Sequence, residues 1–353
     1  MVERDNLHFT FHTIDGYQKP FNFVISEREA GKSTAMILDK LFKNFKDGNT
    51  SLVFRRLIND ITDIYINDIA EIINKFSEYP IKFNFKKGSI KDGIVDVKAK
   101  YKGEERLFMR VVALSNPVSR IKSLFLKNIR CIVFDEFICN PKFNEKYLIN
   151  ESFKFKEIFN TFQREYPQLK CYFLGNPYSL YNPYFVDLKV DTSKLKRGAI
   201  VSGANYVIQC YQICDELKQQ ILERNPLYQF DDSYKKYAFD GMAINDANIR
   251  LRRDLPNNYA IKYAFRINDK FLIVYRNNNW MDVNEYYIKI EDSTSKRRKI
   301  YCFQFDELVA HVVLLSVEER TMFGSLKRAI REQRVEYASE ECYYLIEEIY
   351  KNI

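Results

Sequence analysis

The segment Ser26-Glu27-Arg28-Glu29-Ala30-Gly31-Lys32-Ser33-Thr34 constrains the fold more than any other part of this chain. It departs from the phosphate-loop pattern G-x-x-x-x-G-K-[ST] only at its first position, where Ser26 replaces glycine. An apolar run from Phe21 to Ile25 precedes the loop, and a helix is expected to begin near Lys32. A strand, a loop and a helix in this order predict an α/β domain that binds phosphate at the helix N-terminus.

The last four positions of the loop carry the predicted chemistry. Gly31 lets the backbone pass close to a phosphate group, whose charge is met by backbone N–H groups. Lys32 is expected to reach the β- and γ-phosphates of ATP, and the Ser33 hydroxyl to bind Mg²⁺. Thr34 completes the nucleotide-binding segment. The expected cofactors are therefore ATP and Mg²⁺.

A second motif supplies the acids that an ATPase needs. The apolar run Ile132-Val133-Phe134 ends in Asp135 and Glu136, which is the arrangement of a Walker B strand. Asp135 is expected to hold Mg²⁺ through water, and Glu136 to orient or deprotonate the attacking water as general base. An Asp-Glu pair favours hydrolysis over transfer to a second small substrate. The order of motifs is that of the additional-strand, catalytic-glutamate (ASCE) class of P-loop ATPases.

A third apolar run, Cys171 to Leu174, ends in Gly175-Asn176-Pro177. In this class of ATPase the strand beside Walker B often ends in a polar residue that senses the γ-phosphate. Asn176 is the candidate for this role. The alternative is an Asn-Pro turn without catalytic function.

The spacing of apolar runs predicts two domains joined by a linker. Up to about residue 190, continuous apolar strands alternate with helices, a pattern typical of a mostly parallel sheet covered on both faces. From Asn248 onward, closely spaced strands are followed by two amphipathic helices, over 316–334 and 339–352, which predicts an α+β domain. We therefore expect an ATPase domain over 1–200, a linker over 201–247 and a second domain over 248–353.

Composition excludes several classes of protein. Three histidines in the whole chain argue against a multi-histidine metal site, and seven cysteines without a CxxC pair predict reduced thiols in a cytosol. No apolar run approaches the roughly 20 residues of a membrane-spanning helix, so no membrane partner is expected. Lys and Arg number 55 against 47 Asp and Glu, an excess that is compatible with an anionic partner without requiring one.

Several stretches share their order and spacing with one known family, from about residue 20 to residue 190. They are Phe21-Asn22-Phe23-Val24-Ile25, Arg28 with Gly31-Lys32-Ser33, Ala35-Met36, Arg55-Arg56, Leu114-Ser115, Ile132-Val133-Phe134-Asp135-Glu136-Phe137-Ile138 and Asn182-Pro183-Tyr184-Phe185. On these stretches the chain resembles the DNA-packaging ATPases, or encapsidation proteins, of phi-29-type small short-tailed bacteriophages. The Asp-Glu-Phe and Asn-Pro-Tyr-Phe stretches together are fairly specific to this group.

The resemblance implies an activity and a set of partners. It implies an ATP-driven motor, related to terminases, that translocates double-stranded DNA into a preformed procapsid. Such motors work as a homo-oligomeric ring of five subunits on the portal, or connector, and in phi-29-type phages the ring also engages a packaging RNA. The implied location is the cytoplasm of the infected bacterial cell, transiently at the portal vertex.

The resemblance also assigns roles within the phosphate loop. An arginine at the position of Arg28 is common in packaging ATPases, where it approaches the nucleotide phosphates or couples subunits. Ser26 and Glu29 depart from the family, which often has glycine at these positions. The additional acid of Glu29 next to the phosphates argues against tight nucleotide binding.

Ring ATPases complete each site with a basic residue from the neighbouring subunit, which stabilises the charge of the transition state. Arg164, before the strand that ends at Asn176, and Lys122, before the Walker B strand, align with trans-acting residues of the family. Because the alignment slips by a residue, Arg120 is an alternative to Lys122. The competing interpretation of these residues is a solvated charge.

By resemblance, the second domain is a vestigial nuclease domain of RNase H-like fold. A two-metal nuclease needs several carboxylates that converge on one end of its sheet. Asp282 is an isolated acid, and Asp292, Asp306 and Glu307 do not pair with it convincingly in the sequence. We therefore expect no nuclease activity.

Basic residues of the second domain are candidates for contact with the phosphate backbones of DNA or packaging RNA. Backbone contact is independent of sequence, which suits a motor that must move any genome. The alternative is a solvated charged face. The candidates are Lys296, Arg297, Arg298, Lys299, Lys327, Arg328 and Arg331.

Two other functions remain open at this point. One is a different P-loop nucleic-acid translocase or helicase, which would share the ATP site and differ in its independence of a portal. The other is a non-enzymatic portal or RNA-binding assembly protein with an inactive ATP site. Intact Lys32, Ser33, Asp135 and Glu136 favour an enzyme.

Overall fold

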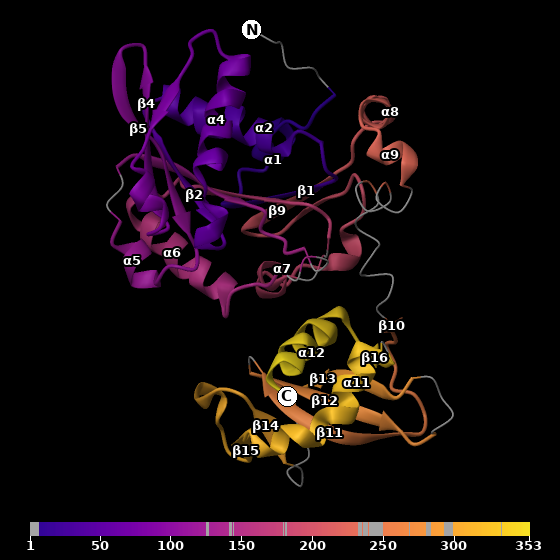
Figure 1. The fold of residues 1–353 in the computed structure, drawn as a ribbon. Coiled ribbons are helices and arrows are strands. Elements are labelled where there is room, and N and C mark those ends of the chain that lie inside the picture. The colour runs from indigo at the N-terminus through magenta and orange to yellow at the C-terminus, as the bar shows by residue number, and fades with distance from the viewer. Residues whose placement is uncertain are drawn as a thin grey trace. The chain divides into compact units, whose positions relative to one another are not determined.

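The computed structural model describes residues 7–124, 127–140, 143, 145–178, 180, 182–231, 235, 239, 250–267, 269–279, 284–292, 299–332 and 334–353. The chain divides into two compact units, Met1–Ala243 and Ile244–Ile353. Each unit has its own sheet and its own apolar core (Figure 1). Within the described residues, no helix is both long and apolar enough to cross a membrane.

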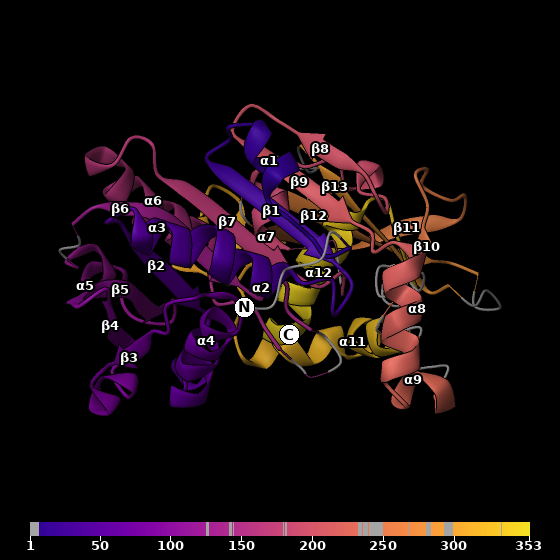
Figure 2. The ribbon, with the colours of Figure 1, turned by 90° about the horizontal axis from the view of Figure 1, so that it is seen from above.

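The first unit is built on a nine-stranded sheet in the order β3-β4-β5-β2-β6-β7-β1-β9-β8. The run from β5 to β9 is parallel throughout, whereas β3, β4 and β8 pair antiparallel at the two edges (Figure 2). The mostly parallel α/β sheet expected from the sequence is confirmed. The strands are β1 (Phe21–Ser26), β2 (Thr50–Arg55), β3 (Lys82–Asn84), β4 (Ile94–Tyr101), β5 (Glu104–Ala113), β6 (Ile129–Asp135), β7 (Lys170–Gly175), β8 (Ile200–Ser202) and β9 (Tyr206–Tyr211).

Helices cover both faces of this sheet, with α2 and α4 on one side and α6 on the other (Figure 1). Successive residues of β1 alternate between the two cores, since Val24 packs in one cluster and Phe23 and Ile25 in the other. This is why a strand buried on both faces is continuously apolar. The helices are α1 (His12–Gly16), α2 (Lys32–Ala35), the π-helical η1 (Met36–Phe42), α3 (Lys43–Lys46), α4 (Asp63–Phe76), α5 (Val118–Lys122), α6 (Glu151–Glu165), α7 (Pro183–Asp187), α8 (Asp215–Arg224) and α9 (Leu227–Phe230).

The first unit extends beyond the boundary expected at residue 200. β9 pairs in parallel with β1 along its whole length, from Phe21 opposite Tyr206 to Ser26 opposite Tyr211. The expectation of a linker over 201–247 is therefore wrong for this part of the chain. The pattern could not show it, because the partner of this short strand lies about 180 residues away in the sequence.

The second unit contains a seven-stranded sheet in the order β10-β16-β13-β12-β11-β14-β15. The strands β11, β12 and β13 form an antiparallel meander, and β14 continues the sheet in parallel with β11. This mixed order is compatible with the expected RNase H-like domain. The strands are β10 (Arg250–Leu251), β11 (Tyr259–Ile267), β12 (Lys270–Asn277), β13 (Tyr286–Glu291), β14 (Ile300–Cys302), β15 (Val312–Leu314) and β16 (Val335–Tyr337).

Two helices pack on one face of the second sheet, α11 (Gly324–Arg331) and α12 (Glu340–Asn352) (Figure 1). Leu326 of α11 and Ile346 of α12 are fully buried in the same cluster as Phe265 and Val274 of the sheet. The single helix expected over 316–334 is shorter, because a 3-10 helix, η9 (Glu318–Phe323), precedes α11 and the strand β16 follows it.

Candidate functional site

The sheet order brings the predicted ATP motifs to one edge of the first unit. β6, β7 and β1 are parallel neighbours, so their carboxyl ends lie side by side. The phosphate loop follows β1, Asp135 ends β6 and Asn176 follows β7. This is the edge at which open parallel α/β sheets bind ligands.

The phosphate loop turns through Gly31, whose φ of 83° lies in the left-handed region. A Cβ at this position would lie 3.0 Å from the Cβ and Cδ2 of His8, so the conformation favours glycine and a larger residue would also have to displace the His8 side chain. The helix then starts at once, with Ala35 N–H donating to Gly31 C=O at 2.8 Å. Through α2, η1 and α3 it runs to Lys46 without a break.

Lys32 joins the ends of β1 and β7. Its buried Nζ donates to Ser26 C=O at 2.9 Å, to the Ser26 hydroxyl at 2.9 Å and to Asn176 Oδ1 at 3.0 Å. Burial lowers the pKa of Lys32 to about 8, because the loss of solvation outweighs the attraction of Asp135 and Glu27. An anionic ligand beside this buried ammonium would stabilise its charged form.

Tyr178 connects Asn176 to Arg28. Its hydroxyl accepts from Arg28 Nη2 at 2.8 Å and from Asn176 Nδ2 at 3.1 Å. Arg28, Lys32 and Asn176, which the sequence placed in one site, are therefore brought together. Tyr178 was not predicted, since nothing in its local sequence shows that it meets an arginine 150 residues away.

Arg55, at the end of β2, faces both Walker B carboxylates. Its Nη2 lies 2.7 Å from Glu136 Oε2 and its Nη1 lies 3.7 Å from Asp135 Oδ2. The guanidinium also lies over the Tyr65 ring, 4.8 Å from its centroid. Arg55 occurs among the stretches that resemble packaging ATPases, but its role depends on the pairing of β2 with β6 and was not predicted.

Asp135 and Glu136 differ in their surroundings. Burial raises the pKa of Asp135, an effect that the charge of Arg55 opposes. Glu136 has a φ of 58° and 62% of its side chain is exposed. A carboxylate with this exposure can meet a water molecule while it keeps its ion pair with Arg55.

A buried ion pair holds the segment that follows β6. Arg56 donates to both carboxylate oxygens of Glu151, at 2.9 and 3.1 Å, and to the C=O groups of Glu136 and Phe137. The Glu151 side chain has no exposed surface and also accepts from the Tyr184 hydroxyl at 2.9 Å. This network fixes the backbone on which Glu136 is mounted.

The Asn-Pro-Tyr-Phe stretch takes part in the same network. Asn182 caps α7, with its Oδ1 accepting from Phe185 N–H at 2.9 Å, and Pro183 occupies the first turn, where no N–H is needed. The cap directs Tyr184 into the core, where it reaches Glu151. The stretch is thus a structural support of the site.

Ser33 and Asp135 are the residues that could hold Mg²⁺. Ser33 is exposed in the first turn of α2, and Asp135 is the carboxylate whose charge acts on the neighbouring Lys32. Among the described residues, no group of three or more His, Cys, Asp or Glu could hold a metal ion. One hydroxyl and one carboxylate still fit Mg²⁺, which takes its other ligands from phosphates and water.

The candidate trans-acting residues lie on or beside α6. This helix starts at Glu151, which pairs with Arg56 directly after β2, and it ends just before the amino end of β7, so Arg164 in its last turn lies near the sheet edge opposite Lys32. Lys122 is ion-paired with Glu157 of α6 at 2.7 Å, and Arg164 is exposed in the last turn of α6. Arg120 Nη1 donates to Asn116 Oδ1 at 3.3 Å.

In the second unit, the candidate nucleic-acid residues are only partly placed. Lys296, Arg297 and Arg298 lie outside the described residues, as does Asp282. Lys299 is ion-paired with Glu319 of η9. The exposed side chains of α11 form a basic face opposite the buried Leu326 and Ala329; they are Lys327, Arg328 and Arg331.

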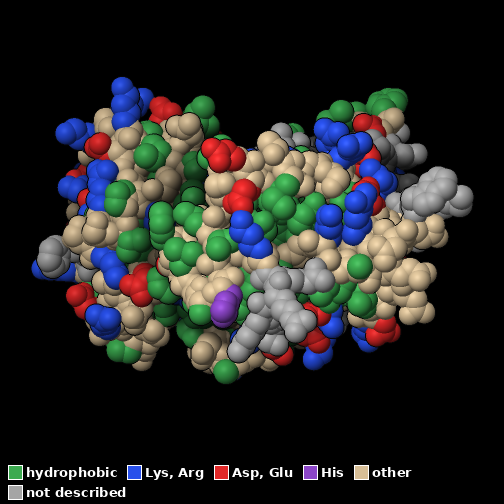
Figure 3. Space-filling model, turned by 90° about the horizontal axis from the view of Figure 1, so that it is seen from below, with side chains coloured by type: hydrophobic (Ala, Val, Ile, Leu, Met, Phe, Trp, Pro, Cys, Tyr) green, Lys and Arg blue, Asp and Glu red, His purple; other side chains and the backbone are tan. Residues whose placement is uncertain are grey.

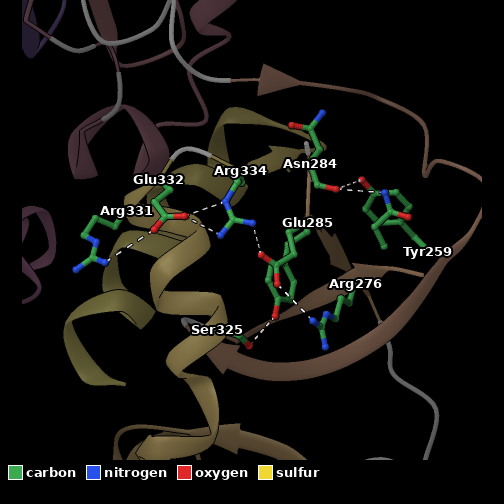
Figure 4. Close-up of polar contacts among 10 residues, drawn as sticks. Tyr259, Arg276, Asn284, Glu285, Ser325, Arg331, Glu332 and Arg334 are labelled. Carbon is green, nitrogen blue, oxygen red and sulfur yellow. Dashed lines mark hydrogen bonds and ion pairs between the residues drawn. The ribbon is translucent and has the colours of Figure 1, made fainter. Parts of the chain in front are cut away.

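Acids accompany this basic face. Arg334 lies 2.7 Å from both Glu332 and Glu285, and Arg276 approaches Glu285 at 3.5 Å (Figure 4). Arg331 is 4.0 Å from Glu332. On the face shown in Figure 3, basic side chains likewise stand among acidic and apolar ones. Any phosphate contact here would be made by a mixed-charge surface.

Comparison with known proteins decides the family. A profile described as Podovirus DNA encapsidation protein (Gp16) matches residues 4–353. The chain belongs to this family. The resemblance to packaging ATPases expected from the sequence is thereby confirmed.

Named relatives of this encapsidation-family chain come from Bacillus phages. The DNA packaging protein of Bacillus phage phi29 is 25% identical over 306 residues, covering 85% of this chain and 83% of the relative. That of Bacillus phage PZA is 24% identical over 306 residues, with the same coverage. A chain of the bacteriophage Phi-29 viral genome packaging motor assembly has a TM-score of 0.67 at 21% identity, covering 98% of this chain and 99% of that chain. The fold is therefore shared along nearly the whole length.

Proposed function

We propose that this chain is an ATP-hydrolysing motor that moves double-stranded viral DNA into a preformed procapsid through the portal vertex. The convergence of Lys32, Asn176 and Asp135 at one sheet edge carries this proposal. Membership of the encapsidation family over residues 4–353 supports the coupling of this site to DNA packaging.

In the proposed site, Lys32 and Arg28 bind the β- and γ-phosphates, and the backbone at Gly31 to Thr34 approaches them. Ser33 and Asp135 would hold Mg²⁺, which would supply positive charge next to the phosphoryl oxygens. Asn176 already touches Lys32 through its Oδ1. A γ-phosphate bound to Lys32 would compete with Asn176 for the Lys32 ammonium. The loss of this hydrogen bond would be the signal that Asn176 transmits.

Glu136 is the proposed general base. Its carboxylate is mostly exposed and is held by Arg55 through Oε2, so the other carboxylate oxygen would accept the proton of the attacking water while Arg55 orients the group. The Arg56–Glu151 network keeps the backbone of Glu136 in place. Arg55 is then a positioning residue for both acids.

The trans-acting roles require a ring. Arg164 lies in the last turn of α6, near the sheet edge opposite the phosphate loop, which supports a role at the ATP site of the next subunit. Lys122, which is ion-paired with Glu157 of the same helix, is proposed for the same role. A homopentameric ring on the portal, with packaging RNA as a further partner, would place one subunit's α6 beside the next subunit's site. Arg120 remains the alternative to Lys122.

The second unit is proposed to contact nucleic-acid backbones without cutting them. The exposed face of Lys327, Arg328 and Arg331 supplies positive charge, together with Lys299 and the run Lys296-Arg297-Arg298. Because Glu332 lies beside Arg331, binding should be weak and strongly dependent on salt.

The test is the ATPase rate of the purified chain with DNA alone and with DNA plus portal-bearing procapsids. A packaging motor is stimulated most when both are present, whereas a helicase needs DNA alone. An assembly protein with an inactive site hydrolyses nothing in either case. Lys32→Ala and Glu136→Gln are the matched controls, the first removing ATP binding and the second only hydrolysis.

A further inference from the structure

Glu29 places a negative charge inside the loop that is proposed to bind phosphates. It is exposed and has a φ of 61°, in the left-handed region that costs a residue with a side chain about 1 kcal/mol or more. Glycine would take this conformation without cost. A carboxylate in a strained backbone position that would also repel bound phosphates is tolerated only if another residue holds it away from them.

Tyr228 is that partner. Its hydroxyl donates to Glu29 Oε1 at 3.0 Å, across 199 residues of sequence. The tyrosine belongs to α9 and its ring is buried, at 4% exposed. Phe239 packs against the ring edge, with the two centroids 5.0 Å apart. The ring is thus held in place, and its hydroxyl is presented to the carboxylate.

The residue after Glu29 is anchored to the same segment. Ala30 is buried in one apolar cluster with Ile213, with Leu217 and Ile221 of α8, and with Tyr228. Among the described residues, the phosphate loop contacts α8 and α9 through the packing of Ala30 and through the Tyr228–Glu29 hydrogen bond. Movement of the Glu29 carboxylate toward the phosphates would have to break the second of these.

We infer that Tyr228 is a positioning residue of the nucleotide site, which acts through Glu29 by holding its carboxylate away from the bound phosphates. This inference rests on the proposed ATPase function. It explains how the loop accommodates an acid beside the proposed phosphate site. It also couples α9 to the nucleotide, because bound phosphates would repel the Glu29 carboxylate and favour its hydrogen bond to Tyr228.

The test is a double-mutant cycle on the full chain with Tyr228→Phe and Glu29→Gln, read out as the Kd of fluorescent MgADP and the KM and kcat for MgATP. Tyr228→Phe keeps the ring and frees the carboxylate, so Kd and KM should rise about three- to tenfold with kcat nearly unchanged. In the Glu29→Gln background the same change should have no effect, because no charge is left to repel the phosphates.

Salt provides a second readout that a structural role would not move. At 0.5 M salt the rise caused by Tyr228→Phe should shrink, because the Glu29 carboxylate is exposed and its charge is screened. An equal rise in both backgrounds, or no rise in either, overturns the inference while the ATPase stands. Absence of MgADP binding and of hydrolysis in the unmodified chain overturns the proposed function and the inference together.

Discussion

Arg55 Nη2 lies 2.7 Å from Glu136 Oε2, so the proposed general base is held by an arginine from the neighbouring strand. The same guanidinium approaches Asp135 and is supported by the Tyr65 ring. The two acids of the Walker B strand are therefore positioned together. Removal of Arg55 should affect the chemical step more than nucleotide binding.

We expect Arg55→Ala to lower kcat for ATP about ten- to a hundredfold and to change KM little, because Glu136 loses its orientation while Lys32 still binds phosphate. Steady-state kinetics on the purified chain measure this. Lys87→Ala is the matched control, since it removes a lysine whose ion pair with Asp63 is exposed. Unchanged kcat in Arg55→Ala would show that Glu136 does not depend on this contact.

Arg56→Ala should destabilise the first unit by about 3–5 kcal/mol, because it leaves the Glu151 carboxylate buried without its charge partner. The measurement is urea unfolding followed by circular dichroism. Lys122→Ala breaks the ion pair with Glu157, whose side chain is 42% exposed. It should lower the free energy of unfolding by less than about 1 kcal/mol. Equal losses in the two variants would contradict the role of Arg56 as a buried support.

Arg164→Ala should keep ATP binding and lose hydrolysis in the assembled ring, because its effect is exerted on the neighbouring subunit. Rings mixed from Arg164→Ala and unmodified subunits should show activity that falls with the mutant fraction. Lys156→Ala, which removes another exposed charge of α6, is the control. Normal hydrolysis by fully substituted rings refutes the assignment and leaves Lys122 or Arg120 as candidates.

Cys214 should be the first thiol to react with iodoacetamide in the folded protein, because it is exposed and the other six cysteines are buried. Burial raises the pKa of Cys131 to about 11 and that of Cys210 to about 12, so only about one Cys131 in a thousand is thiolate at pH 8. The protonated thiols of Cys131 and Cys210 contribute fully to the free energy of unfolding below the unfolded pKa of about 8.5. This contribution is lost as pH rises through their raised pKa values in the folded protein. Mass spectrometry of labelled peptides checks the order. Early labelling of Cys131 would contradict its burial.

The sequence was most informative where local pattern and chemistry coincide. The apolar runs that became β1, β6 and β7, each followed by a polar motif, predicted the parallel sheet and the residues at its carboxyl edge. Lys32 and Asn176 do touch. Their catalytic roles remain predictions.

Contacts across large sequence separations could not be predicted. Tyr178 and Tyr228 are ordinary aromatic residues in their own segments, and they matter because the fold brings them to Arg28 and Glu29. The place of β9 in the first sheet was missed for the same reason, since its partner β1 lies far away in the chain. Local periodicity reports burial, but it does not report which buried or polar groups meet.

The most direct test of the central claim is protection of DNA from nuclease by purified procapsids, this chain and ATP, with packaging RNA supplied. Translocation into the procapsid predicts full-length protected DNA that depends on ATP and on the portal. Glu136→Gln, which keeps ATP binding, should abolish protection. No protected DNA with the unmodified chain, or equal protection with Glu136→Gln, would contradict a motor driven by hydrolysis at this site.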